Sequence, residues 1–240
     1  MKQTFALVDE RISDKCFSAL TDRGFYPVRL PKMPSLPSPI ASHTDIISFK
    51  LKEKLFFSRK YFELFREQLS PLGSQNLLLT DMSQGEKYPL DAIFNGLLIS
   101  DILFCKSDTF SKEILAEAER EGIRIVHVNQ GYPACTTLKI SENAAVTADR
   151  GMEKALLKEG ISVLFIENGD ISLPPYDYGF IGGCAGIYKD EIFFLGDIKR
   201  HRDCDRICDF ITSLKKKSTS LSDEPLSDLG GIIFTEATVF

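Results

Sequence analysis

Along this chain a helical pattern changes repeatedly to an extended one, each time at a glycine. Four helix-like segments end at Gly24, Gly73, Gly122 and Gly160, and a β-prone run follows each of them. The first three glycines are 49 residues apart (positions 24, 73 and 122), and the fourth follows 38 residues later. Glycine is typical of a helix C-terminus because it adopts the left-handed conformation without strain. The chain is therefore predicted to repeat one unit of helix and strand.

A pair of short β-prone runs, interrupted by a polar turn, precedes each later helix. The pairs are 45–51 with 55–59, 97–99 with 103–106, 138–140 with 144–147, and 186–188 with 192–195. Helices are predicted at 13–23, in the segments before the other three glycines, and at 203–214, because apolar residues recur there with helical spacing. Ser13 and Asp149 are placed as helix N-caps, and Asp108 and Asp197 are also placed to cap the next helix. Four units then have the order β-β-α-β.

The two ends of the chain supply the parts of a fifth unit. The β-prone run at 5–8 leads directly into a helix, and the run at 231–235 has no helix of its own. Pairing these runs completes the unit and removes exposed strand edges. We therefore predict one α/β domain over 1–240, a five-unit ββαβ pseudo-symmetric propeller closed by the N- and C-terminal strands. An open α/β sheet with recurring helices is the alternative.

Composition excludes several classes of partner. The chain is 43% hydrophobic and 26% charged, with a formal net charge of −5. Only residues 215–217 form a run of lysines, so we expect no nucleic-acid partner. No apolar run approaches the roughly 18 residues of a membrane span, and no membrane partner is expected. The six cysteines form no Cys-x-x-Cys pair, which is typical of reduced thiols in a cytoplasmic protein.

Two segments interrupt the repeat. Residues 31–42 contain four prolines and are predicted to run extended over the surface, because proline is excluded from helix interiors. Residues 168–183 form a long loop rich in Gly, Pro, Tyr and Asp. Long loops on a rigid scaffold often carry functional residues.

Several motifs resemble the pentein superfamily of guanidine-group-modifying enzymes, and within it a branch to which no function is assigned. The likeness spans nearly the whole chain and is carried by 42–45, 130–135, 142–144, 176–183 and 223–230. The resemblance implies a ring of five units around a channel that the first strand of each unit lines. It also implies that the segments leading into those strands, at 43–45, 96, 131–135, 178–183 and 228–230, form the channel mouth. A small-molecule site is expected there, without a cofactor.

The resemblance also suggests chemical roles. Catalytic penteins attack a guanidinium or amidine carbon with a cysteine thiolate, helped by a His-x-Asp element and by carboxylates that hold the cation. This implies Cys135 as nucleophile with His43 and Asp45 as catalytic partners. The candidates for substrate binding are Asp177, Tyr178, Asp228 and Glu224. These residue types suit the chemistry because a thiolate is a strong nucleophile, imidazole exchanges protons near neutral pH, and carboxylates match the guanidinium fork.

The chain departs from the catalytic pattern in two places. Catalytic penteins place their cysteine shortly before the last strand, where this chain has 228–231 and no cysteine. Their His-x-Asp element also comes later in the chain. We therefore keep three functions open: a hydrolase or transferase acting on a guanidino or amidino compound, a non-catalytic binding or assembly module, and a binding protein for cationic metabolites.

Each candidate also has a structural interpretation. Cys135 suits a small buried core position, and His43 suits a turn after the proline-rich segment. Cys184 is a second candidate thiol. His201, Cys204 and Cys208 lack an evident fourth ligand, so no metal site is predicted. The glycines at 179, 182, 183 and 186 are expected to let the backbone crowd near the channel axis.

Overall fold

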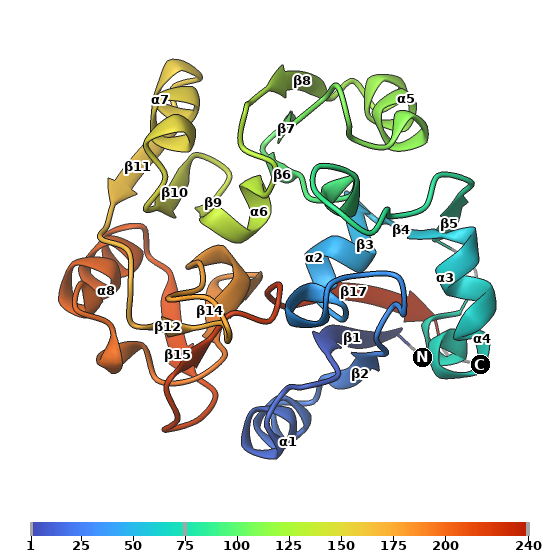
Figure 1. The fold of residues 1–240 in the computed structure, drawn as a ribbon. Coiled ribbons are helices and arrows are strands. Elements are labelled where there is room, and N and C mark those ends of the chain that lie inside the picture. The colour runs from blue at the N-terminus through green and yellow to red at the C-terminus, as the bar shows by residue number, and fades with distance from the viewer. Residues whose placement is uncertain (1, 74–75, 239–240) are drawn as a thin grey trace.

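The computed structural model describes residues 2–73 and 76–238 and contains five three-stranded sheets of one design (Figure 1). In each sheet the middle strand pairs antiparallel with one neighbour and parallel with the other. The sheets are β17 (Ile233–Thr238), β1 (Lys2–Asp9) and β2 (Tyr26–Leu30); β3 (Ser48–Leu51), β4 (Lys54–Ser58) and β5 (Leu77–Thr80); β6 (Leu97–Ile99), β7 (Ile102–Cys105) and β8 (Arg124–His127); β9 (Thr137–Ser141), β10 (Ala144–Thr147) and β11 (Ser162–Phe165); and β13 (Ala185–Tyr188), β14 (Glu191–Phe194) and β15 (Lys217–Ser220). The predicted β-β-α-β units are confirmed.

The helices cross from the middle strand of each sheet to its parallel partner, and Figure 1 shows them at the outside of the molecule. They are α1 (Asp14–Asp22), α3 (Arg59–Leu64) with α4 (Arg66–Leu69), α5 (Lys112–Arg120), α7 (Arg150–Lys158) and α8 (Cys204–Ser213). The glycines that follow the first four crossings all have positive φ, as predicted: Gly24, Gly73, Gly122 and Gly160.

The helix N-caps were predicted only in part. Ser13 caps α1 and Asp149 caps α7, as expected. Asp108 caps no helix, because a turn follows β7 and Ser111 accepts from the Ile114 amide at the start of α5. Asp197 caps the short 3-10 turn η5 (Ile198–Arg200) that comes before α8.

The first and last strands of the described chain pair with each other. β17 lies antiparallel to β1, with Leu7 opposite Ile233 and Phe5 opposite Thr235. The predicted pairing of the N- and C-terminal runs is therefore confirmed. It converts an α-β segment at one end and a lone strand at the other into a sheet of the same design as the other four.

Short helical turns, not extended chain, lead into the inner strands that pair antiparallel with the middle strands. They are α2 (Thr44–Ile47), η3 (Leu90–Ala92), α6 (Pro133–Thr136) and η4 (Gly182–Cys184). The predicted strand at 45–51 therefore begins only at Ser48. Tertiary contacts stabilise α2, since the Thr44 hydroxyl donates to the carbonyl oxygens of Gly230 and Gly231.

The proline-rich segment does not run over the surface as predicted. Met33, Leu36 and Ala41 are buried and pack in one cluster with Leu7 and Phe57. The segment also contains a single 3-10 turn, η1 (Ser38–Ile40). Apolar side chains between the prolines bury enough surface to hold the segment against the core, and this brings the following residues into the interior.

The long loop at 168–183 has structure of its own. Its β12 (Ile171–Ser172) pairs parallel with β16 (Leu226–Ser227) in a two-stranded sheet. This pairing holds the loop beside the segment that leads into β17. No helix in the described part of the chain is both long enough and apolar enough to cross a lipid bilayer.

Candidate functional site

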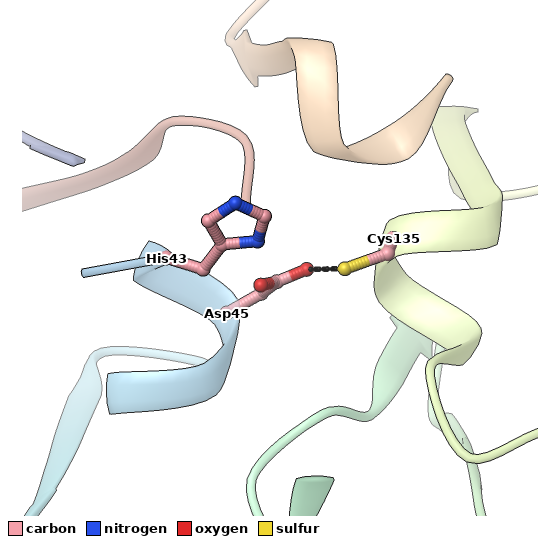
Figure 2. A group of neighbouring side chains, drawn as sticks. All are labelled: His43, Asp45 and Cys135. Carbon is pink, nitrogen blue, oxygen red and sulfur yellow. Dashed lines mark hydrogen bonds between the residues drawn. The ribbon is translucent and has the colours of Figure 1, made fainter. Parts of the chain in front are cut away.

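Three of the predicted site residues meet in the interior (Figure 2). His43 is the residue before α2, Asp45 lies in the first turn of that helix, and Cys135 lies in α6. The Cys135 Sγ donates to Asp45 Oδ2 at 2.6 Å. One atom each from the imidazole, the carboxylate and the thiol lie within 4.8 Å of one another. Residues that are 90 positions apart in the sequence therefore lie together. We call His43, Asp45 and Cys135 the Cys135 cluster.

Asn95, which sequence reasoning missed, holds the Cys135 cluster in place. Its Nδ2 donates to Cys135 Sγ at 3.4 Å and its Oδ1 accepts from the Ala134 amide at 2.8 Å. The side chain is 1% exposed. The signal available in the sequence was its position just before Gly96, where the expected channel mouth meets β6.

Asp228 forms the acidic side of the site. The carboxylate is 1% exposed and accepts from the amides of Phe180 at 2.9 Å and Gly230 at 3.2 Å. Its Oδ1 lies 3.9 Å from His43 Nδ1. Gly183 packs against this carboxylate so closely that a Cβ would lie 1.9 Å from Oδ1. Only a residue without a side chain fits at this position.

A cavity of about 410 Å³ opens beside these groups. Its lining includes His43, Cys135, Asp177, Tyr178 and Asp228, all of which the sequence singled out. The remaining wall is apolar or aromatic, and is made of Pro37, Ile40, Ile46, Tyr132, Leu173, Tyr176 and Phe180, with one further acid, Asp91. The proline-rich segment and the 168–183 loop therefore both contribute to the wall. The proline-rich segment can do so because it packs against the core.

Asp91 is a second residue that sequence reasoning missed. It is 3% exposed, its Oδ2 accepts from the Tyr132 hydroxyl at 2.9 Å, and its Oδ1 makes no hydrogen bond within the described chain. Both ring nitrogens of His43 and the Oδ1 of Asp45 are likewise buried without a partner there. Buried polar atoms normally have a hydrogen-bond partner. These four atoms therefore mark places where a polar ligand would be favoured.

Burial governs the protonation of the site. It raises the pKa of Asp45 to about 8, and the neighbouring Asp228 carboxylate adds to the increase. Burial also raises the pKa of Asp228 and raises that of Cys135 well above its ordinary value, with Asp45 and Asp228 adding to the latter. For His43 burial lowers the pKa. Near neutral pH the thiol and the Asp45 carboxyl keep their protons and the imidazole is uncharged.

In the described part of the chain, His43, Asp45 and Cys135 are the side chains whose donor atoms lie close enough together to hold a metal ion. Thiolate, imidazole and carboxylate are all zinc ligands. Among the described residues, His201, Cys204 and Cys208 do not form such a group.

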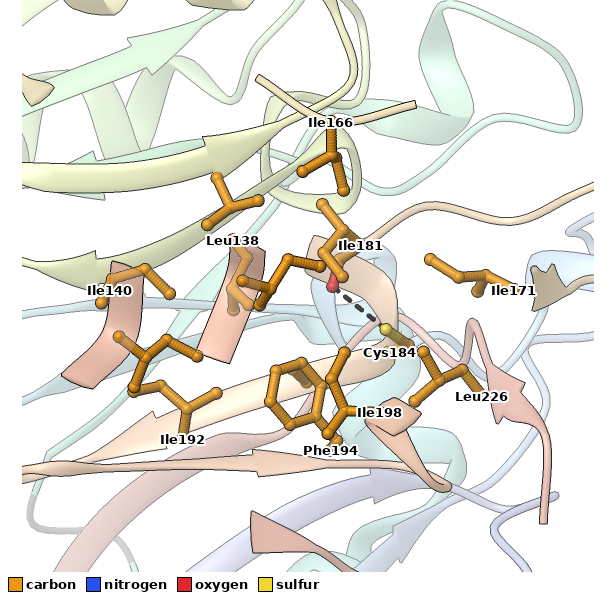
Figure 3. Close-up of a cluster of buried hydrophobic side chains, with 14 of the residues drawn as sticks. Leu138, Ile140, Ile166, Ile171, Ile181, Cys184, Ile192, Phe194, Ile198 and Leu226 are labelled. Atoms are coloured by element: carbon orange, nitrogen blue, oxygen red, sulfur yellow. Dashed lines mark hydrogen bonds between the residues drawn. The ribbon is translucent and has the colours of Figure 1, made fainter. Parts of the chain in front are cut away.

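Two expected residues lie outside the site. Glu224, predicted to bind substrate, is part of neither the Cys135 cluster nor the cavity wall. Its half-exposed side chain lies at the surface, 3.9 Å from Lys15 Nζ. Cys184 is enclosed in an apolar cluster and its Sγ donates to the Ile181 carbonyl at 3.2 Å (Figure 3).

The fold is similar to that of several solved structures. A variant of dimethylarginine dimethylaminohydrolase (DDAH) with histidine replaced by glycine, in an adduct with S-methyl-L-thiocitrulline, matches with a TM-score of 0.58 and 10% identity over 93% of each chain. DDAH from Pseudomonas aeruginosa, a cysteine-to-serine mutant complexed with citrulline, matches at 0.56 and 10% over 92% of each chain. Agmatine deiminase of C. jejuni matches at 0.55 and 8%, over 92% of this chain and 91% of that one. The chain has the pentein fold that the sequence motifs implied.

The chain belongs to the family of unknown function DUF6873, whose model matches residues 7–233. A search of the curated proteins found no match. At identities near 10%, the likeness to the solved penteins establishes the fold, while chemistry has to be argued from the site itself.

Proposed function

We propose that this protein acts on a guanidino or amidino compound, as a hydrolase or transferase, with the Cys135 thiol as nucleophile. The observation that carries the proposal is the 2.6 Å contact between Cys135 Sγ and Asp45 Oδ2, with the His43 ring beside it at a cavity that Asp228 also lines. Solved structures with the same fold include dimethylarginine dimethylaminohydrolase and agmatine deiminase, whose names point to the same chemistry.

A bound cation would change the protonation of the Cys135 cluster. The carboxylates of Asp45 and Asp228 can accept hydrogen bonds from a planar guanidinium. A positive charge placed beside a buried acid favours its ionised form, and so lowers the pKa that burial raised. The substrate itself would therefore favour formation of the Cys135 thiolate. In this scheme the protein keeps its thiol protonated until a ligand of the correct charge arrives.

The first half of the proposed reaction forms a thioether. Binding of the cation first releases the proton of the Asp45 carboxyl to solvent. Cys135 Sγ then bonds to the central carbon of the guanidinium while the thiol proton passes to the Asp45 carboxylate. The bond from that carbon to one nitrogen then breaks, and the departing amine takes the proton from Asp45. An amidino thioether that keeps the positive charge remains on the enzyme.

The second half regenerates the thiol. Water bonds to the carbon and gives one proton to His43, whose imidazole is uncharged because burial lowers its pKa. The carbon–sulfur bond breaks and the sulfur recovers that proton. The carbon leaves as a neutral urea derivative. The remaining proton of the water passes to solvent and converts the released amine to ammonium, so one cation enters and one leaves. Asp45 takes up a proton again when the site empties. In a transferase an acceptor amine would take the place of water.

A second candidate function is binding of a cationic metabolite without reaction. It is favoured by the Cys135 thiol itself, which is 4% exposed and whose pKa is raised well above its ordinary value. The chain also lacks a cysteine at 228–231, before the last strand. In this alternative Asp45 and Asp228 hold the cation and Cys135 serves as a packed polar neighbour.

Labelling with a haloacetamidine tests the catalytic proposal, because this reagent carries an amidinium beside an alkylating carbon. We expect Cys135 to react at least about tenfold faster than the other five cysteines, located by mass spectrometry of digested protein. Cys135→Ala should abolish the fast labelling and Cys184→Ala should leave it unchanged. Slow, even labelling of all six cysteines would contradict a nucleophilic role. If agmatine still raises the melting temperature of both variants, the binding function would remain.

We further propose that the five units close into a pseudo-symmetric propeller around one axis. A cavity of about 340 Å³ is lined by residues from all five inner strands, β3, β6, β9, β13 and β17. Lys50 Nζ on β3 donates to the Phe234 carbonyl on β17 at 2.7 Å, and β9 contacts both β6 and β13. These contacts and the β1–β17 pairing support a ring of neighbouring inner strands.

A further inference from the structure

The charge of the 410 Å³ cavity limits which guanidino compounds it can hold. Asp91, Asp177 and Asp228 line it, and no lysine or arginine does so among the residues that the structure describes. Arg11 lies close enough to Asp228 to interact with it, but its Nε and Nη2 are bonded to Asp9 at 2.9 and 2.6 Å. A ligand carboxylate in this cavity would lose water without gaining a cationic partner, which is unfavourable.

Asp91 supplies a carboxylate that the proposed reaction does not use. Asp91 lies in η3, whereas the residues of the Cys135 cluster lie at α2 and in α6. The Tyr132 hydroxyl orients its Oδ2, which leaves the buried Oδ1 without a partner within the described residues. Because Asp91 lines the cavity, a donor for this oxygen can come from a ligand there.

Aromatic side chains stand beside this carboxylate. The Tyr132 ring lies 5.7 Å from the Tyr88 ring, and both Tyr132 and Tyr176 line the cavity. Tyr176 and Tyr178, which are 55% and 39% exposed, line the same cavity as Asp91. Aromatic faces with a nearby carboxylate favour an organic cation, since ring and charge both attract it.

We propose that the site takes a guanidinium or amidinium compound that ends in an amine and carries no carboxylate, and that Asp91 binds the amine. This inference rests on the proposed function, because it assumes that the Cys135 cluster faces the guanidinium end of the ligand. It adds a second cation subsite and excludes amino acids as the preferred class of substrate. The ligand would place one positive charge at Asp228, beside His43 and Cys135, and the other at Asp91.

Two matched pairs of ligands test the inference. Agmatine and L-arginine differ by the carboxylate, and agmatine and butylguanidine differ by the terminal amine. Affinities are measured by calorimetry with the full chain carrying Cys135→Ala, so that no turnover occurs. We expect agmatine to bind at least about tenfold more tightly than arginine and than butylguanidine, as for a lost charge-assisted hydrogen bond.

A second variant locates the amine. Asp91→Asn keeps the shape of the side chain and an acceptor for Tyr132, so it should weaken agmatine about tenfold and leave butylguanidine unchanged. Asp101→Asn is the control, since that carboxylate is 71% exposed and lies outside the cavity. It should change neither affinity.

The possible failures are distinguishable. Equal or tighter binding of arginine would overturn the inference while leaving the guanidino chemistry intact. Equal weakening of agmatine and butylguanidine by Asp91→Asn would overturn the assignment of Asp91 to the amine. Failure of all three ligands to bind, together with slow labelling of Cys135, would overturn the proposed function as well. The comparison of agmatine with arginine needs no Asp91 variant, so it decides the inference even if Asp91→Asn fails to fold.

Discussion

Replacing Asp45 by asparagine should make the protein more stable at high pH. The carboxyl is buried, its Oδ1 has no partner in the described chain, and its pKa is about 8 in the folded protein. In the unfolded chain the group ionises near its ordinary value of 3.8. Between these two values the folded protein holds one more proton than the unfolded protein, so its stability falls as the pH rises.

The magnitude follows from the pH window. One pH unit of differential protonation is worth about 1.4 kcal/mol, so the three units from pH 5 to pH 8 reduce the free energy of unfolding by up to about 4 kcal/mol. The loss is absent below the ordinary pKa and complete above about pH 8. Asparagine has the shape of the protonated acid and does not titrate. The stability of Asp45→Asn relative to the natural protein should therefore increase by up to about 4 kcal/mol over this range.

Urea unfolding at pH 5 and pH 8, without ligand, measures this difference. Cys135 and Asp228, which also face Asp45, are present in both proteins, so their titration cancels to a first approximation. Asp177→Asn is the matched control, because it removes an exposed carboxylate that lines the 410 Å³ cavity next to Cys135 and His43. A relative stability that changes by less than about 1 kcal/mol between the two pH values would refute the argument that Asp45 is kept protonated by burial.

Two further predictions concern the closing strand and the glycine beside Asp228. Phe234→Ala should lower the free energy of unfolding by about 3–5 kcal/mol in urea melts, because this side chain is 5% exposed and packs with Phe25, Tyr188 and Phe193. Leu157→Ala, at a position 54% exposed, should change it by less than about 0.5 kcal/mol, and equal effects would contradict the packing of β17. Gly183→Ala should displace the Asp228 carboxylate from the Phe180 and Gly230 amides and cost about 1–3 kcal/mol. In calorimetry the same variant should weaken agmatine binding, and unchanged affinity would remove Asp228 from the site.

The local sequence was sufficient to locate the units of the fold. The helix ends at Gly24, Gly122 and Gly160, the cap at Asp149 and the strand Leu97–Ile99 all match the predictions. Each of these features depends on residues within a few positions of one another, so the pattern of the sequence records them directly. Where the prediction failed, as at Ser48 and in the proline-rich segment, contacts with distant residues decided the conformation.

The site could be predicted only where its residues stand out by type. His43, Cys135 and Asp228 were singled out as candidates because histidine, cysteine and aspartate at the expected channel mouth are chemically conspicuous. Asn95 and Asp91 were missed because their importance lies in partners about 40 positions away, at Cys135 and Tyr132. Glu224 was wrongly grouped with Asp228, since four positions of sequence do not say which side chain faces inward.

The repeated unit, the pairing of the terminal strands and the set of reactive side chains could all be read from the amino-acid sequence. The folded chain was needed to learn which of these side chains share a cavity and which are kept protonated by burial. Hydrogen bonding and desolvation act over a few ångströms of space, and packing across the whole chain is what brings the contacting residues to that distance.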